Sequence, residues 1–101
     1  MTQVFFMPEA ERQRDLELDW WLENRPTNPF LFLDELNETL LLFQSNPLAG
    51  RLYRKQLEVR VYLLPGTRYQ VFYRYLQAED VIRIHAVWGA QRRRGPPLSR
   101  P

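Results

Sequence analysis

The sequence predicts a single α+β domain, in which an N-terminal strand and a two-helix hairpin pack on a mainly antiparallel sheet of three to four strands. Three observations predict this fold. Residues 4–6 form a short β-prone run, apolar residues recur at helical spacing over residues 9–45, and alternation with a period of two follows over residues 57–88. The change of period falls near Gly50. A strand, two helices and three strands in this order are typical of a sheet with its helices on one face.

The first helix is expected to begin at Glu9, after the short strand. Acidic residues early in this segment favour a helix N-terminus. Ala10, Leu16 and Trp20 are expected to share the packed face, with Gln13 between them. The helix should end near residues 24–26, because proline disfavours helical conformation at the residue before it.

A second helix is expected to follow at once. Asn28 is a good N-cap, and Pro29 suits the first helical turn. The apolar stripe of this helix has spacings of three, four and three residues, and it consists of Leu33, Leu36, Leu40 and Phe43. Residues 45–50 end the helix in a loop.

Three strands are expected after this loop, at residues 57–64, 69–76 and 81–88. Pro65-Gly66 predicts a type II turn between the first two, and residues 77–80 make the next turn. Residues 89–101 carry three prolines and a triple arginine. We expect residues 1–95 to form the domain and residues 96–101 a flexible tail.

Side chains alternate between the two faces of a strand, so the pattern assigns a face to each residue. The set expected to face the helices is Val59, Val61, Leu63, Val71, Tyr73, Tyr75, Ile82, Ile84, Ala86 and Trp88. The set left for the outer face is Arg60, Tyr62, Phe72, Arg74, Arg83 and His85. Arginines between aromatic residues suit phosphates with stacked bases, or a peptide with apolar anchors and acidic flanks. The alternative is an ordinary solvated sheet face without a ligand.

The charge of the chain is divided between its halves. Residues 1–50 carry a net charge of −6 and residues 51–101 a net charge of +8, and thirteen of the fourteen basic residues are arginines. Arginine suits phosphate and carboxylate groups, so the second half favours an anionic partner. The alternative is that the two halves neutralise each other within the fold.

Several classes of site and location are disfavoured by the residues present. There is no cysteine, and the one histidine, His85, cannot build a multi-histidine metal site. No phosphate loop or nucleophile elbow is present, so neither a cofactor nor a metal is expected. No run reaches the roughly 20 apolar residues of a membrane span. The start lacks a signal peptide's pattern, and we expect a cytoplasmic protein with no membrane partner.

Several short motifs resemble the RelE/ParE toxin superfamily of bacterial type II toxin–antitoxin systems, and the chain looks closer to ParE. The matching residues are Ala10 with Asp15-Leu16, the segment 46–51, Val59-Arg60 before the strand 69–73, and residues 82–88 running into Arg92-Arg93. The resemblance covers roughly residues 3–95. It implies a cognate antitoxin as partner, contact with operator DNA only through that antitoxin, and a role such as plasmid stabilization.

The resemblance implies one of two activities. RelE-like members are ribosome-dependent mRNA endonucleases, whereas ParE-like members inhibit DNA gyrase by binding it. The tyrosine or His-Tyr pair expected after the last strand of a nuclease is absent, and Trp88 with three arginines stands there instead. Because tryptophan has no titratable proton, this favours the ParE-like activity, which is not enzymatic. The alternatives are a RelE-like nuclease or an inactive or redirected homologue.

The functional residues follow from this interpretation. Residues expected to bind the target are Arg60, Arg74, Arg83, Trp88, Arg92, Arg93 and Arg94. The helices carry more apolar residues than one small core needs, and we expect the additional ones to bind the antitoxin. These residues are Trp21, Leu31, Phe32, Leu41 and Leu42. In the alternative nuclease interpretation, the catalytic residues would be Arg60, Arg83 and His85.

Overall fold

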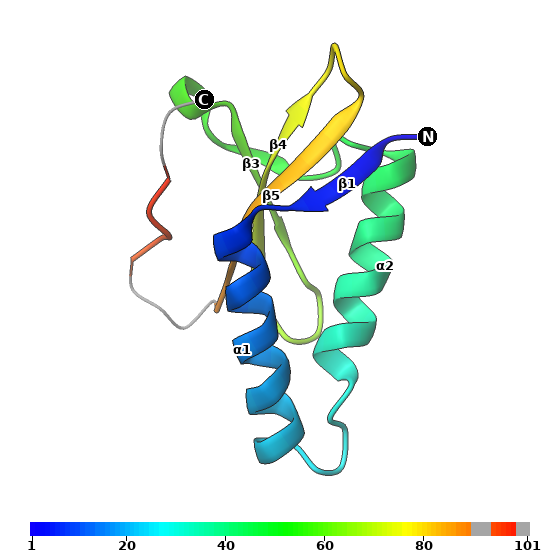
Figure 1. Ribbon diagram of the computed structural model, residues 1–101, viewed down its shortest axis with the longest axis vertical. Coiled ribbons are helices and arrows are strands. Elements are labelled where there is room, and N and C mark those ends of the chain that lie inside the picture. The colour runs from blue at the N-terminus through cyan, green and yellow to red at the C-terminus, as the bar shows by residue number, and fades with distance from the viewer. Residues whose placement is uncertain (90–93, 99–101) are drawn as a thin grey trace.

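The computed structural model describes residues 1–89 and 94–98 and confirms the predicted α+β class. Two helices pack on one face of a five-stranded sheet, as Figure 1 shows, so the sheet has one or two strands more than expected. The elements are β1 (Gln3–Phe6), α1 (Pro8–Asn24), α2 (Leu31–Ser45), β2 (Arg51–Arg54), the 3-10 turn η1 (Lys55–Leu57), β3 (Val59–Leu63), β4 (Gln70–Leu76) and β5 (Val81–Trp88).

The strands lie in the order β1-β5-β4-β3-β2. β1 runs parallel to β5, and all other neighbours are antiparallel. The helical hairpin between β1 and the meander carries the chain across one face of the sheet (Figure 1). The strand that was not predicted, β2, forms one edge of the sheet and pairs with β3.

The packed face of α1 differs from the predicted one. Ala10 is fully buried, and Gln13 Oε1 accepts a hydrogen bond of 2.8 Å from the backbone N–H of Val87. Leu16 and Trp20, expected on this face, are 55% and 42% exposed. The prediction was wrong for these two residues, because the packed face of α1 runs through Ala10, Leu18 and Trp21 instead.

Helix α2 begins at Leu31, with Phe30 at the N-cap position and no side-chain cap. The predicted cap at Asn28 was wrong, because Asn28 lies in the turn before the helix. Its backbone carbonyl accepts a hydrogen bond of 3.4 Å from the N–H of Leu31. The most buried residues of α2 are Phe32, Leu36 and Phe43.

The loop between β3 and β4 is not the predicted type II turn. No glycine among the described residues has a positive φ, and Arg68 takes a left-handed conformation with φ 68°. The carboxylate of Glu35 on α2 accepts the backbone N–H groups of Gly66 and Thr67 at 2.5 and 2.8 Å. A Cβ at position 66 would lie 2.7 Å from Glu35 Oε2, so a larger residue would require this carboxylate to move.

The two faces of the sheet also differ from the simple alternation. Phe72 pairs with Ala86, but Tyr73 pairs with Ile84, so His85 is an extra residue in a β-bulge. After this bulge, each residue of β5 points to the opposite face of the sheet from the one that simple alternation predicts. Residues found on the outer face instead of the helix face are Val59, Val61, Leu63, Ala86 and Trp88, while Arg60, Tyr62 and Val87 lie on the helix face.

Candidate functional site

The centre of the outer face is an apolar cluster, not the predicted surface of arginines and aromatics. Its buried members are Val59, Val61, Phe72 and Ala86, each at most 3% exposed. These four residues are called the seat below. The side chains that pack against the seat are Tyr53, Leu57, Trp88 and Leu98.

Arg74 and His85 lie together beside this cluster. Arg74 is only 6% exposed, and its Nε donates a hydrogen bond of 2.8 Å to the carbonyl of Leu57. Its Nη1 lies 3.2 Å from His85 Nε2, which must accept because arginine can only donate. Burial and the charges of Arg74 and Arg83 lower the pKa of His85 to about 4. The imidazole is therefore neutral at neutral pH.

Arg83 is exposed on the same face and is the cross-strand partner of Arg74. Arg60, by contrast, lies on the helix face, where its Nη1 donates a hydrogen bond of 2.8 Å to the carbonyl of Gly50. The sheet thus separates Arg60 from His85. Of the residues proposed for catalysis, the structure brings Arg83 and His85 to one face and leaves Arg60 on the other.

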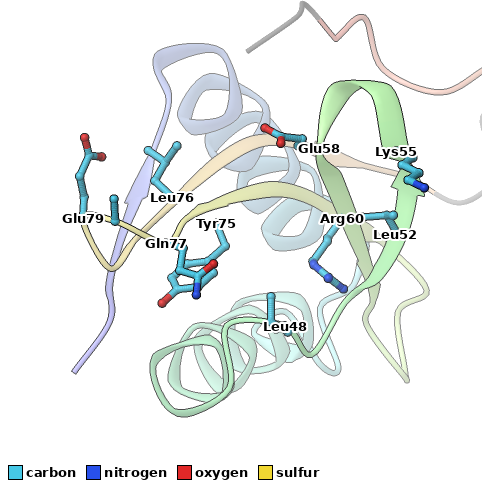
Figure 2. Close-up of a pocket in the computed structure, with 10 residues that line it drawn as sticks. Leu48, Leu52, Lys55, Glu58, Arg60, Tyr75, Leu76, Gln77 and Glu79 are labelled. Carbon is cyan, nitrogen blue, oxygen red and sulfur yellow. The ribbon is translucent and has the colours of Figure 1, made fainter.

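Arg60 lines an open pocket of about 590 Å³ at the end of the sheet near β2 (Figure 2). The phenol of Tyr75 and the carboxylates of Glu58 and Glu79 contribute to the same pocket. Leu48 and Leu52, also in its lining, are 53% and 46% exposed. Lys55 also lines the pocket, so two basic and two acidic side chains balance each other and the lining does not favour a phosphate.

Trp88 connects the last strand with the C-terminal segment. Its indole Nε1 donates a hydrogen bond of 2.7 Å to the carbonyl of Arg94, whose side chain is exposed. Arg92 and Arg93, also predicted to bind the target, lie outside the described residues. Of the residues expected in the flexible tail, Leu98 packs against the outer-face cluster and Pro96 is buried, while residues 99–101 are outside the described part.

The residues predicted for the antitoxin are only partly available at the surface. Trp21 and Leu31 line a pocket of about 720 Å³ between the two helices and the β3–β4 loop. Leu41 is 66% exposed and Leu42 half-buried. Phe32 is fully buried against Tyr69 in the core, so a partner could contact it only after this part of the core opens.

A polar network in this pocket was not predicted from the sequence. Tyr69 OH donates to Glu17 Oε2 at 2.6 Å and accepts from Trp21 Nε1 at 3.2 Å. Burial and the Glu17 carboxylate raise the pKa of Tyr69 to about 12. The guanidinium of Arg25 stands over the rings of Trp20 and Trp21 at 4.9 and 5.8 Å. Tyr69 lies 52 residues from Glu17 and 48 from Trp21, so local sequence carried no signal that it joins these residues of α1.

Comparison with known proteins decides the family. The sequence profile of the ParE toxin of the type II toxin–antitoxin system parDE matches residues 4–94. The chain belongs to the ParE toxin family. No curated protein matches the chain.

Two solved structures share the fold. A chain from the chromosomal ParDE system of P. aeruginosa has a TM-score of 0.72 at 18% identity, covering 90% of this chain and 98% of that one. A chain from the intact E. coli RelBE toxin–antitoxin complex has a TM-score of 0.59 at 19% identity, covering 91% and 100%. At this identity the likeness establishes the fold alone.

Two further observations concern metals and membranes. No group of three or more histidine and carboxylate side chains within residues 1–89 and 94–98 could hold a metal ion. In the same part of the chain, no helix is long and apolar enough to cross a membrane.

Proposed function

We propose that this protein is the toxin of a type II pair, that it acts in the cytoplasm by binding DNA gyrase, and that it does not cut mRNA. The observation that carries the proposal is the placement of His85. Cleavage of RNA needs one group to take the 2′-hydroxyl proton and another to protonate the leaving oxygen, with pKa values near the working pH. His85, with a pKa of about 4, is a weak base, and the guanidinium of Arg74 occupies its Nε2.

The positions of the arginines favour binding of a target protein over proton transfer to or from RNA. Arg60 lies across the sheet from His85, and Arg74 is buried, so neither can join His85 on an RNA phosphate without rearrangement. Arg94 is exposed next to Trp88, at the end of the segment with the arginine triplet. A cationic segment of this kind suits an acidic protein surface.

The test is a comparison of two variants in growing cells. Replacing Arg92, Arg93 and Arg94 together should abolish growth inhibition, while His85→Ala should leave it largely intact. Purified gyrase should lose supercoiling activity with the wild-type protein and with His85→Ala. If His85→Ala alone removes toxicity in a folded protein, and ribosomes with this protein cleave mRNA, the RelE-like nuclease interpretation is correct instead.

A cognate antitoxin is proposed as the neutralising partner. The two solved structures described above come from toxin–antitoxin systems, and this chain leaves apolar side chains at its surface. We assign the contact to Trp21 and Leu31 in their pocket and to Leu41 and Leu42 on α2. The protein that neutralises toxicity on co-expression should bind wild type and fail with Leu41→Asp. Leu16→Asp, on the exposed face of α1, is the matched control, and equal loss with both variants would contradict this assignment.

A further inference from the structure

The pocket between the two helices and the β3–β4 loop has the size and the lining of a small-molecule site. Its volume of about 720 Å³ lies within the range of about 300–1,000 Å³ that is usual for ligand pockets. Its lining includes two tryptophans and a leucine, together with two arginines and one carboxylate. Apolar walls with a few polar groups are typical of pockets that hold one ligand in one orientation.

The two arginines of this pocket have donors available for an anion. Arg25 lies over the rings of Trp20 and Trp21 at 4.9 and 5.8 Å, and Arg68 comes from the β3–β4 loop. Both arginine side chains are exposed. Within the described part of the chain, the two ion pairs lie between residues 9 and 15, so neither Arg25 nor Arg68 is paired with a carboxylate. The fork of a guanidinium group suits a phosphate.

The β3–β4 loop holds Arg68 in a conformation that costs free energy. Its φ is 68°, in the left-handed region that disfavours every residue with a Cβ. The carboxylate of Glu35 fixes the loop by accepting the N–H groups of Gly66 and Thr67. In the same wall, the hydroxyl of Thr67 is buried and has no hydrogen-bond partner within the described residues. Backbone strain and an orphan polar group are both typical of binding sites.

The wall formed by α1 offers a hydrogen-bond acceptor and an aromatic surface. Glu17, Trp21 and Arg25 follow one another at intervals of four residues, so they share one side of the helix. Glu17 Oε2 accepts the hydroxyl of Tyr69 at 2.6 Å, whereas Oε1 receives no hydrogen bond from the described part of the chain. Trp20 is 42% exposed. A ligand that fits this wall brings N–H groups to the carboxylate and a flat ring to the indole.

We propose that this pocket binds a guanine nucleotide, with its base at the α1 wall and its phosphate between the two arginines. Guanine presents two adjacent donors, N1–H and N2–H, to the carboxylate of Glu17, and its ring stacks on Trp20. The phosphate accepts hydrogen bonds from Arg25 and Arg68. Adenine is disfavoured, because the ring nitrogen beside its amino group is an acceptor that faces the carboxylate. The proposal goes beyond the proposed function and does not depend on it, since the chain alone forms the site.

Binding is measured by titrating guanosine monophosphate into the full chain and following the indole N–H signals of its three tryptophans by NMR. The signals of Trp20 and Trp21 should move. The signal of Trp88 should stay in place, because its indole is bonded to the carbonyl of Arg94 on the outer face. Adenosine monophosphate and guanosine should each bind about tenfold more weakly, since one lacks the paired donors and the other the phosphate. Equal binding of guanosine, or the same shifts with inorganic phosphate alone, would overturn the proposal.

Variants of the pocket locate the site. Arg68→Gly removes the guanidinium but suits the left-handed backbone, so it should weaken binding about tenfold without lowering the melting temperature. Gly89→Leu should block the pocket, because a Cβ there meets only Tyr69, at 4.0 Å. Arg25→Gln should also weaken binding about tenfold. Arg51→Gln, which makes the same change of charge on β2, is the matched control and should bind like wild type. Equal losses in these two variants, or unchanged binding in Arg68→Gly, would show only a general attraction to a basic chain and would refute the site.

Discussion

The buried phenol of Tyr73 connects the sheet with the loop that follows α2, and its removal should destabilise the protein strongly. Tyr73 is fully buried, its OH donates to the carbonyl of Pro47 at 3.0 Å, and it accepts the N–H of Gly50 at 2.8 Å. Tyr73→Phe would leave both backbone groups without this partner. An orphaned buried N–H costs about 1–3 kcal/mol, and a lost ordinary hydrogen bond about 0.5–1.5 kcal/mol.

We therefore expect Tyr73→Phe to lower the free energy of unfolding by about 2–3 kcal/mol, out of the 5–15 kcal/mol typical of small domains. Urea unfolding should show a midpoint lowered by about 1 M with an unchanged slope. The matched control is Tyr75→Phe, because the Tyr75 hydroxyl bonds to the exposed Asp80 at 2.8 Å. Its midpoint should move much less than that of Tyr73→Phe, because water can replace the lost partner of Asp80. A loss below about 1 kcal/mol for Tyr73→Phe, or equal losses in both variants, would refute this account of the loop.

Three further predictions concern pH and the helix–loop contact. Because the pKa of His85 is lowered to about 4 from 6.5, the unfolded state binds a proton first on acidification, so stability should fall as pH drops from about 6.5 to about 4. His85→Asn should flatten this part of the pH profile of thermal unfolding. Because the pKa of Tyr69 is raised to about 12 from 10.0, stability should fall as pH rises from about 10 to about 12, and Tyr69→Phe should reduce that slope. Glu35→Ala should cost about 1–2 kcal/mol in urea unfolding by freeing two N–H groups of the β3–β4 loop, whereas Glu38→Ala, exposed on the same helix, should cost less than about 0.5 kcal/mol.

The order and type of most elements could be predicted because the segment with helical periodicity and the segment with strand periodicity are each long and do not overlap. The strand β2 could not be predicted, since its four residues carry no alternation and its place at the sheet edge depends on pairing with β3. The limits of β3 were also missed, because Glu58 takes a left-handed conformation, with φ 54°, before the strand begins. Local residue patterns do not contain this information.

The candidate site was harder to predict than the fold, because it depends on which face each residue takes. The alternation placed Arg60 on the outer face, but its register against Tyr73 puts it on the helix side. The apolar cluster on the outer face was not predicted for a related reason. The sequence correctly predicts that Val59 and Val61 are buried. The cluster in which they are buried, however, lies on the opposite side of the sheet from the helices. The hydrophobicity of a residue predicts that it is buried, but it does not predict which part of the fold covers it.

The bulge at His85 has a consequence for the face of the sheet on which Trp88 lies. With unbroken alternation from Ile84, Ala86 and Trp88 would face the helices, and the chain would leave the sheet on that side. The extra residue reverses these faces, so Val87 joins the helix-side core and Trp88 packs beside Ala86 on the outer face. There its indole N–H can reach the carbonyl of Arg94. A single irregularity in β5 thus places the indole of Trp88 on the second apolar face of the sheet, where it packs against the buried cluster.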